Sequence, residues 1–301
     1  MPAPHWQGVF PAVTTQFRQD QSLDLEATGR HLEALLESGV QGLIMCGSLG
    51  ENQALDPDEK RRVVERAVQV AAGKVPVLSG VAEMSTAAAC RYVRDCEKLG
   101  AAGFMVMPAM VYKAEPREAI NHFRRVGAAM GTPWMLYNNP VGYAVDITPE
   151  QMVELSDVKN LVAIKESSAN PRRITELRLA TAERFSLFVG VDDLLLESAI
   201  LGIDGWVAGS GIAFPRENQH FWNLTRAGRW DDARAMYRWF YPLLKLDTHI
   251  KFVQYIKLAV QEAGLGSEWV REPRLPLIGA EREQVLRIIR HGIENRPKLA
   301  G

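Results

Sequence analysis

The sequence has few cysteines, no long apolar run and almost no net charge. Its three cysteines, at positions 46, 90 and 96 of 301, are odd in number and lack the spacing of metal ligands, which indicates a reducing compartment. None of the six histidines pairs with another four residues away, as a helical zinc site would need. We therefore expect a protein without a metal.

The chain also lacks the features of secreted, membrane and nucleic-acid-binding proteins. No apolar run reaches the length of a membrane span, and the first residues, MPAPHWQGVF, lack the basic and apolar regions of a secretory signal. A formal net charge of −1, with charges interspersed, provides no basic surface for nucleic acid or an anionic membrane. We expect a cytoplasmic protein with no cofactor, no nucleic-acid partner and no membrane partner.

Short apolar runs alternate with amphipathic stretches along the chain. Residues 25–37 carry leucines near one face at helical spacing, and residues 58–72 follow Asp56-Pro57, a favourable helix start. Residues 86–99 and 115–130 show similar helical patterns. We interpret as strands the eight apolar runs at residues 9–15, 42–47, 75–81, 103–108, 133–140, 161–167, 186–192 and 205–211.

This alternation predicts an α/β fold with eight βα units, a (β/α)8 TIM barrel over residues 1–228. A doubly wound sheet is the rival fold, but no G-x-G-x-x-G follows the first strand, and the GSG at 209–211 lacks the third glycine. Residues 229–301 predict a C-terminal helical extension, with helices within 230–263 and 281–294. We expect the extension to pack on the barrel or on another subunit, so that the chain forms one structural unit.

Polar residues follow several of the predicted strands, where a barrel places its active site. Lys165 ends the sixth strand, and burial lowers the pKa of such a lysine and yields a neutral amine that can attack a ketone. The alternative is a structural lysine paired with a carboxylate. Glu166 is a poor partner, because adjacent residues of a strand point to opposite faces.

Two further strand ends carry candidate residues. Tyr137 ends the fifth strand, where its phenol can shuttle protons during Schiff-base formation, or can simply be a core tyrosine. The stretch Gly47-Ser48-Leu49-Gly50 follows the second strand and offers backbone amides to a substrate carboxylate, although glycines also serve a plain turn.

Together these segments resemble the dihydrodipicolinate synthase/N-acetylneuraminate lyase family. The resemblance rests on G-S/T-x-G-E, Y-N-x-P and I-K-E, here GSLGE, YNNP and IKE, and runs from about residue 6 to the C-terminal helices. It implies a class I Schiff-base lyase or aldolase with a (β/α)8 barrel. Lys165 would be the Schiff-base lysine and Tyr137 the proton relay, and the amides of Ser48 and Leu49 would hold the carboxylate of a 2-oxo acid.

Further substrate contacts are expected at neighbouring strand ends. We expect Gly47, Asn139, Gly190, Val207 and Gly209 to bind substrate. Asn139 serves equally well as a turn residue before Pro140. Asp192 either reaches the site or caps the next helix, and we favour the cap.

Departures from the family pattern restrict the range of substrates that the protein is expected to use. Leu49 stands where the synthases have a second threonine, and Gly142 or one of its neighbours lies where an arginine usually holds the second substrate's carboxylate. Met110 occupies the slot of a tyrosine that the synthases lend to a neighbouring subunit, and whether the shifted Tyr112 replaces it stays open. These differences argue against a synthase of lysine biosynthesis. No polar cluster for a long sugar chain supports an N-acetylneuraminate lyase.

The stretches YNNPVGYAVDITPE, IKESSANPRRI and RWFYPLLKLD resemble the 1-pyrroline-4-hydroxy-2-carboxylate deaminases of hydroxyproline breakdown, our leading hypothesis. Such an enzyme converts this cyclic imino acid into 2-oxoglutarate semialdehyde and ammonia. The runner-up is an aldolase or dehydratase, either like dihydrodipicolinate synthase or acting on a 2-keto-3-deoxy sugar acid. A protein that only binds 2-oxo acids is the non-enzymatic alternative. The resemblance also implies a homotetramer.

Overall fold

The computed structural model describes residues 5–109 and 113–299, and within them eight parallel strands form one sheet. The strand order is β1-β8-β7-β6-β5-β4-β3-β2, and a parallel bridge from Ala12 to Ile44 joins the segment after β1 to β2. This is the predicted (β/α)8 barrel. The strands are β1 (Gly8–Val9), β2 (Leu43–Met45), β3 (Val77–Val81), β4 (Gly103–Val106), β5 (Trp134–Asn138), β6 (Leu161–Glu166), β7 (Ser186–Val189) and β8 (Gly205–Trp206).

The strands are shorter than the apolar runs that predicted them. In β1 and β8 only two residues have strand geometry. The chain nevertheless stays bonded to the barrel beyond β1, because the backbone N–H of Ala12 donates to the carbonyl of Ala208 at 2.8 Å. Except at β3, each apolar run therefore covers a strand and the first residues of the loop that follows it, where several of the polar residues lie.

Aromatic side chains fill the barrel interior. The rings of Phe10 and Phe188 meet edge-on with their centroids 5.2 Å apart, and both side chains are buried. Glycines make room for them: a Cβ on Gly42 would lie 2.7 Å from Cζ of Phe10, and one on Gly205 would lie 2.6 Å from Cζ of Phe188. The interior is thus a packed core, and chemistry is left to the strand ends.

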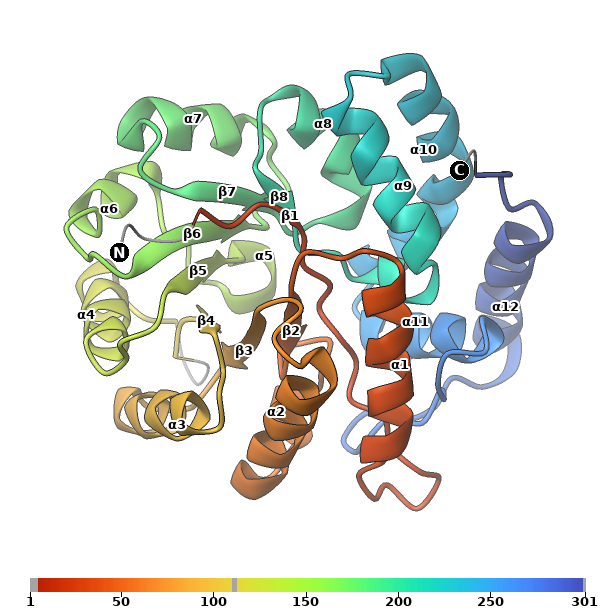
Figure 1. The fold of residues 1–301 in the computed structure, drawn as a ribbon, viewed down its shortest axis with the longest axis horizontal. Helices are drawn as coiled ribbons and strands as arrows, with labels where there is room; N and C mark the ends of the chain where they lie inside the picture. Colours follow the sequence, from red (N-terminus) through yellow and green to blue (C-terminus); the bar gives the residue numbers. More distant parts are fainter. Residues whose placement is uncertain (1–4, 110–112, 300–301) are drawn as a thin grey trace.

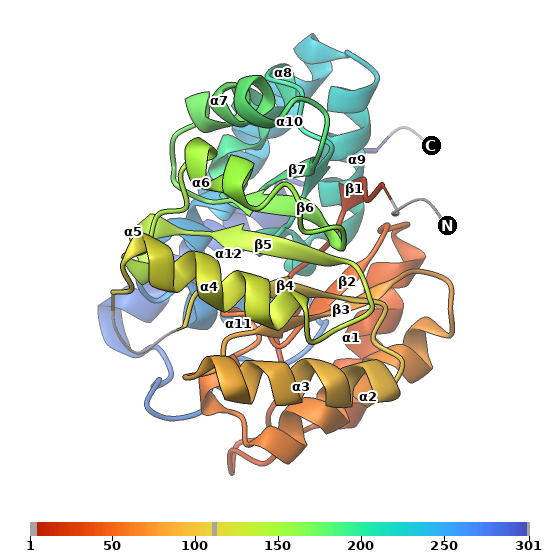
Figure 2. The same cartoon turned by 90° about the vertical axis from the view of Figure 1, so that its left-hand side faces the viewer.

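The helices lie outside the strands, as α3 and α4 show in Figure 2. Three were predicted to within one residue at each end, and α4 ends three residues before its predicted end. Side-chain caps explain two of the starts: Asp24 accepts from the amide of Ala27 at 2.9 Å, and Asp56 with Glu59 forms a capping box. The α-helices are α1 (Leu25–Glu37), α2 (Pro57–Ala71), α3 (Thr86–Lys98), α4 (Pro116–Gly127), α5 (Pro140–Tyr143), α6 (Pro149–Glu154), α7 (Arg172–Thr181), α8 (Leu195–Ile200), α9 (Pro215–Arg226), α10 (Trp230–Leu244), α11 (Phe252–Glu262) and α12 (Gly279–Glu294). The 3₁₀ helices are η1 (Asn52–Ala54), η2 (Asp192–Leu194), η3 (Ser210–Ala213) and η4 (Lys245–Thr248).

The C-terminal helices α10, α11 and α12 gather on one side of the barrel, near α9 and α1 (Figure 1). Phe240 of α10 packs edge-on against Phe214 and Phe221, so its ring joins the core beneath α9. The domain boundary predicted at residue 228 falls in the turn between α9 and α10. That division of the chain stays a prediction.

Residues 230–263, where helices were predicted, form α10 and α11 rather than one continuous helix. Pro242 lacks an amide donor and α10 ends shortly after it, giving way to η4. The 3₁₀ helix η4 lies beside η2, which follows β7 in the chain. The hydroxyl of Tyr237 donates to the carbonyl of Asp193 at 2.6 Å, and Lys245 Nζ lies 3.4 Å from the Asp193 carboxylate. The break therefore brings η4 to the carboxyl end of β7.

Within residues 5–109 and 113–299, no helix combines the length and apolar character needed to cross a bilayer. Met110 and Tyr112, the two positions singled out for an inter-subunit tyrosine, lie outside the described residues.

Candidate active site

Lys165 lies at the end of β6, directly beside Tyr137 of β5 in the register of the sheet. Its side chain is 6% exposed, and Nζ lies 3.9 Å from the centroid of the Tyr137 ring. No ion pair among the described residues includes Lys165. Burial lowers the pKa of Lys165, against the opposing influence of Tyr143, Asp247 and Asp192. The site therefore favours a neutral amine.

Glu166 faces away from Lys165, as the alternation of a strand predicts. Its carboxylate accepts hydrogen bonds from the side-chain amide of Asn138 at 3.0 Å and from the backbone amide of Ser168 at 2.6 Å. Burial raises the pKa of Glu166. The prediction that Glu166 is not the partner of Lys165 is confirmed by these contacts.

Gly190 follows β7 and makes room for the lysine. A Cβ at this position would lie 2.7 Å from Lys165 Cγ and would also collide with Lys165 Cε and Ser167 Oγ. The Ser167 hydroxyl is itself buried and finds no hydrogen-bond partner within the described part of the chain. Gly190 thus leaves the space that the Lys165 side chain occupies, and a direct contact with substrate stays a prediction.

Asn139 links Tyr137 to the short helix α5. Its Nδ2 donates to the Tyr137 hydroxyl at 3.1 Å, while its Oδ1 accepts from the backbone N–H of Gly142 at 2.8 Å and caps α5. Burial raises the pKa of Tyr137 to about 12, so the phenol holds its proton at neutral pH. Asn139 is therefore a turn residue that also positions Tyr137, and its contact with substrate stays a prediction.

The loop after β2 presents backbone amides, as predicted for a carboxylate site. The amides of Ser48 and Leu49 donate to no protein acceptor within residues 5–109 and 113–299. Gly50 packs closely, because a Cβ there would lie 3.0 Å from the carbonyl oxygen of Val13. A Cβ at Gly47 would lie 3.4 Å from Cε of Met105, an ordinary contact. Leu49 is 3% exposed and packs into the core, so only its backbone remains for substrate.

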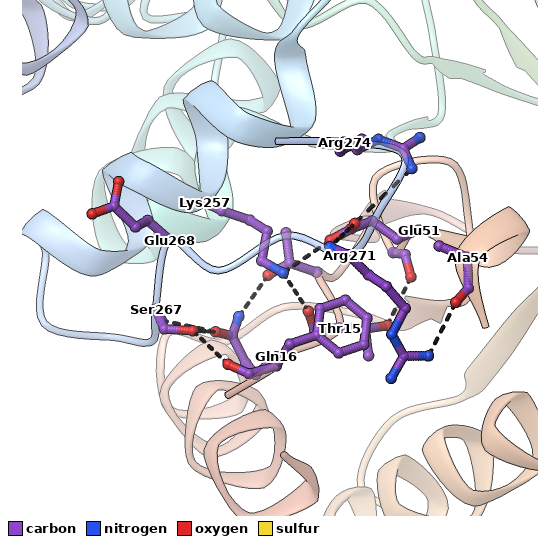
Figure 3. A network of polar contacts seen from close by, with 12 residues as sticks. Thr15, Gln16, Glu51, Ala54, Lys257, Ser267, Glu268, Arg271 and Arg274 are labelled. Atoms are coloured by element: carbon purple, nitrogen blue, oxygen red, sulfur yellow. Dashed lines mark hydrogen bonds and ion pairs between the residues drawn. The ribbon is translucent and has the colours of Figure 1, made fainter. Parts of the chain in front are cut away.

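The far end of this loop is fixed by a buried ion pair (Figure 3). Glu51, in the left-handed conformation with φ of 56°, lies 2.9 Å from Nζ of Lys257 in α11, and both side chains are fully buried. Lys257 also donates to the carbonyl of Thr15 at 2.8 Å, and the Arg271 amide donates to Glu51 at 3.0 Å. The C-terminal extension thereby holds the loop after β2, a role that the sequence pattern GSLGE did not reveal.

Asp192 is not a helix cap, so the preferred interpretation of this residue was wrong. Its buried carboxylate accepts from the indole N–H of Trp206 at 3.0 Å and from the amides of Gly209 and Ser210 at 3.0 and 2.5 Å. These donors belong to β8 and the loop after it, rather than to the helix that Asp192 begins. Val207, buried within the same segment, donates its amide to the carbonyl of Val189.

Asp247 of η4 is a site residue that sequence reasoning missed. A Cβ on Gly209 would lie 2.9 Å from Asp247 Cγ and 3.4 Å from Asp192 Oδ2, so the two carboxylates flank Gly209. Burial and the neighbouring Asp192 raise the pKa of Asp247 well above its ordinary value, while Lys165 lowers it. Two carboxylates thus act on the electrostatics of Lys165, with Gly209 between them.

Tyr143 was also missed. It ends α5, six positions after Tyr137 in YNNPVGY, and its hydroxyl forms a hydrogen bond with that of Ser48. Its ring meets the Tyr137 ring edge-on, with centroids 5.6 Å apart. The spacing matches neither a strand nor a regular helix, so no sequence pattern predicts that the two phenols meet.

The sequence matches the Dihydrodipicolinate synthetase family over residues 5–292. The chain is similar to 4-hydroxy-tetrahydrodipicolinate synthases of Xanthomonas campestris (32% identity, covering 95% of this chain and 94% of the relative) and Halalkalibacterium halodurans (30%, covering 92% and 94%). Its structure resembles that of dihydrodipicolinate synthase from Aquifex aeolicus, with a TM-score of 0.90 and 28% identity over 95% and 97% of the two chains.

A further solved structure shows a ligand. YagE of E. coli K12, described as a member of the dihydrodipicolinic acid synthase family in complex with pyruvate, has a TM-score of 0.89 at 25% identity over 96% of this chain and 99% of YagE. The two sequence relatives and the Aquifex aeolicus protein are named synthases, and none of the proteins named here is named a deaminase. The comparisons therefore support the aldolase alternative and give no support to the deaminase hypothesis.

Proposed function

Because the chain belongs to the dihydrodipicolinate synthetase family, we propose that it is a class I lyase in which Lys165 forms a Schiff base with a small 2-oxo acid. One observation carries the proposal: a buried amine, without a carboxylate partner among the described residues, lies over a phenol ring at 3.9 Å. A protein that only binds 2-oxo acids would have no use for such an amine.

The geometry supports a stepwise reaction. Neutral Lys165 attacks C2 of the 2-oxo acid, and the proton lost from nitrogen passes to the former carbonyl oxygen. Tyr137 donates a proton as that oxygen leaves as water, which yields the protonated Schiff base. The free amides of Ser48 and Leu49 hold the substrate carboxylate beside the reacting carbon. Loss of a proton from C3 then gives an enamine.

The fate of the enamine distinguishes two candidate reactions. In an aldolase its C3 adds to an aldehyde, or the reverse step releases one. The names of the relatives favour this chemistry.

One feature of the site favours the deaminase instead. Gly142 provides no cation where the resemblance leads us to expect an arginine, and Asp192 and Asp247 place carboxylates on the strand-eight side of Lys165. Such a site suits a substrate whose far end carries a hydroxyl or an amine better than one with a second carboxylate. Ring opening of 1-pyrroline-4-hydroxy-2-carboxylate by Lys165 produces such an end.

The deaminase steps balance with water as the only co-reactant. Attack of Lys165 at C2 breaks the ring C2–N bond and leaves a free terminal amine. Loss of a C3 proton expels the C4 hydroxyl as water, and tautomerisation moves the double bond to the terminal C–N bond. Hydrolysis of that imine releases ammonia, and hydrolysis of the Schiff base releases 2-oxoglutarate semialdehyde.

Two product assays separate the candidates, each run with Lys165→Ala as control. Lysine-dependent release of ammonia from 1-pyrroline-4-hydroxy-2-carboxylate supports the deaminase. Lysine-dependent release of pyruvate from 2-keto-3-deoxy sugar acids, without ammonia, supports the aldolase. Measurable pyruvate binding with no covalent trapping by borohydride would contradict both and leave a binding protein. Light scattering of the purified chain tests the homotetramer, which the family resemblance favours.

A further inference from the structure

Two phenols of the same chain meet at Lys165, and only Tyr137 has so far been given a role. Tyr137 is 6% exposed, so it has little access to bulk solvent. Formation of the protonated Schiff base takes one proton from Tyr137, and hydrolysis of the Schiff base gives one back, so protons must move to and from Tyr137 in every cycle. A second group has to connect it to solvent.

Tyr143 has the position that this connection requires. It is partly exposed at the end of α5, where Val141 is 76% exposed, and its ring meets the Tyr137 ring edge-on. The two phenols also influence each other's pKa through their hydroxyls. Tyr143 therefore lies between the buried phenol and the surface.

The hydrogen bonds around α5 are compatible with proton transfer from the Tyr143 hydroxyl to the Tyr137 hydroxyl. Asn139 donates to the Tyr137 oxygen and so does not take up the phenolic proton. The Tyr143 hydroxyl is fixed by that of Ser48, in the loop that offers amides to the substrate carboxylate. Asn139 also caps α5 and thereby orients Tyr143. One turn of chain thus aligns both phenols.

We propose that Tyr143 is the relay residue that returns protons from solvent to Tyr137, with its hydroxyl held by Ser48. When Tyr137 gives its proton to the departing oxygen, the Tyr143 proton passes to the Tyr137 oxygen, and Tyr143 regains one from water. No oxidant or reductant is needed. This inference rests on the proposed function and adds that the relay is complete within one chain.

The test measures how fast the Schiff base forms. The protein is mixed with pyruvate, quenched with borohydride at successive times, and the adduct is counted by mass spectrometry. Tyr143→Phe keeps the ring and removes the hydroxyl, so adduct formation slows by about 10- to 100-fold while the final trapped fraction stays unchanged. Val141→Ala in the same turn forms the adduct at the normal rate.

Two further variants separate a relay from a merely structural tyrosine. Ser48→Ala slows the same step, and adding it to Tyr143→Phe causes little further loss, since both hydroxyls serve one path. A small weak acid such as imidazolium accelerates Tyr143→Phe but not the unsubstituted chain. Thermal unfolding of each variant confirms that it is folded.

Each remaining outcome has a definite meaning. A normal rate of trapping in folded Tyr143→Phe overturns the relay and leaves the Schiff base intact. Slow trapping in Tyr112→Phe, with normal trapping in Tyr143→Phe, overturns it in favour of the other tyrosine. If the unsubstituted chain traps no pyruvate, both the relay and the proposed function are wrong.

Discussion

Lys165 and Lys257 are both buried lysines, and they differ in the polar groups that surround the amine. Lys257, fully buried, has a carboxylate at 2.9 Å and a carbonyl at 2.8 Å. An aromatic ring lies near both amines, with the Phe17 centroid 4.5 Å from Nζ of Lys257 and the Tyr137 centroid 3.9 Å from Nζ of Lys165. Lys165 differs in having no direct carboxylate partner among the described residues. Burial lowers the pKa of both, but only for Lys257 does a hydrogen-bonded carboxylate oppose the shift.

The difference shows how one residue type serves two purposes. A lysine paired with a buried carboxylate keeps its charge and connects two segments, here α11 and the loop that ends in Glu51. A buried lysine without such a partner releases its proton more readily and becomes a nucleophile. Burial alone does not distinguish a structural lysine from a nucleophilic one. The distinction lies in whether a carboxylate is hydrogen-bonded to the amine.

The largest expected effect comes from removing the nucleophile. Lys165→Met abolishes borohydride trapping and lowers turnover by roughly 10⁴-fold or more, because no other group forms the Schiff base. Burial holds the folded pKa of Lys165 below its ordinary value of 10.5, so below that pH the unfolded chain binds a proton more readily. Stability therefore falls as pH drops from 10.5, and Lys165→Met is more stable than the unsubstituted chain at pH 7. Urea unfolding measures this; a marked loss of stability would instead indicate a structural lysine.

Breaking the structural pair should cost stability. Lys257→Met leaves Glu51 buried without a cation and lowers the free energy of unfolding by about 3–5 kcal/mol. Lys257→Met with Glu51→Gln recovers part of that loss, because the uncompensated charge is gone. Folded Lys257→Met still traps pyruvate at Lys165, with a raised KM because the loop after β2, which we propose binds the substrate carboxylate, is less well held. An unchanged urea midpoint would show that the pair does not hold the loop.

Crowding the nucleophile should affect rate and stability together. Gly190→Ala places a methyl group against Lys165 and Ser167, which costs about 1–3 kcal/mol in the packed site. It also displaces the amine and slows adduct formation. Gly202→Ala is no suitable control because its φ is positive, so Gly131→Ala, with only one atom within 4 Å of the new Cβ, serves instead. If Gly190→Ala and Gly131→Ala trap pyruvate at equal rates, the absence of a side chain at position 190 does not position Lys165.

The smallest expected effect concerns the electrostatics of Lys165. Asp247 raises the pKa of Lys165 against the lowering by burial. Asp247→Asn therefore lowers that pKa further, and the amine stays neutral to a lower pH. The acid limb of the pH profile for adduct formation shifts downward, and the shift is small because burial and Tyr143 affect the pKa of Lys165 more than Asp247 does. A shift to higher pH would contradict the assigned arrangement of charges.

The repeating units of the fold were predictable because each of them is local. Eight apolar runs and the helical spacing between them identified the barrel, and Lys165 and Tyr137 were located because each polar residue ends an apolar strand. The interruption at η4 was not predicted, since one proline near the end of α10 decides where that helix stops.

The missed site residues depend on contacts between distant or irregular segments. Asp247 reaches the site only because η4 packs beside η2, as the ion pair between Lys245 and Asp193 shows, and no sequence periodicity records a contact across more than fifty positions. Tyr143 points at Ser48 because Asn139 caps a single helical turn. Asp192 was assigned to its own helix because sequence spacing shows nearby amides, while its actual donors come from the loop after β8.

The most direct test of the contrast between the two lysines is to map where pyruvate becomes trapped. The unsubstituted protein is incubated with pyruvate, reduced with borohydride, digested and analysed by peptide mass spectrometry. The account predicts a modified peptide containing Lys165 and an unmodified peptide containing Lys257. Modification at Lys257, or none at Lys165, would contradict it.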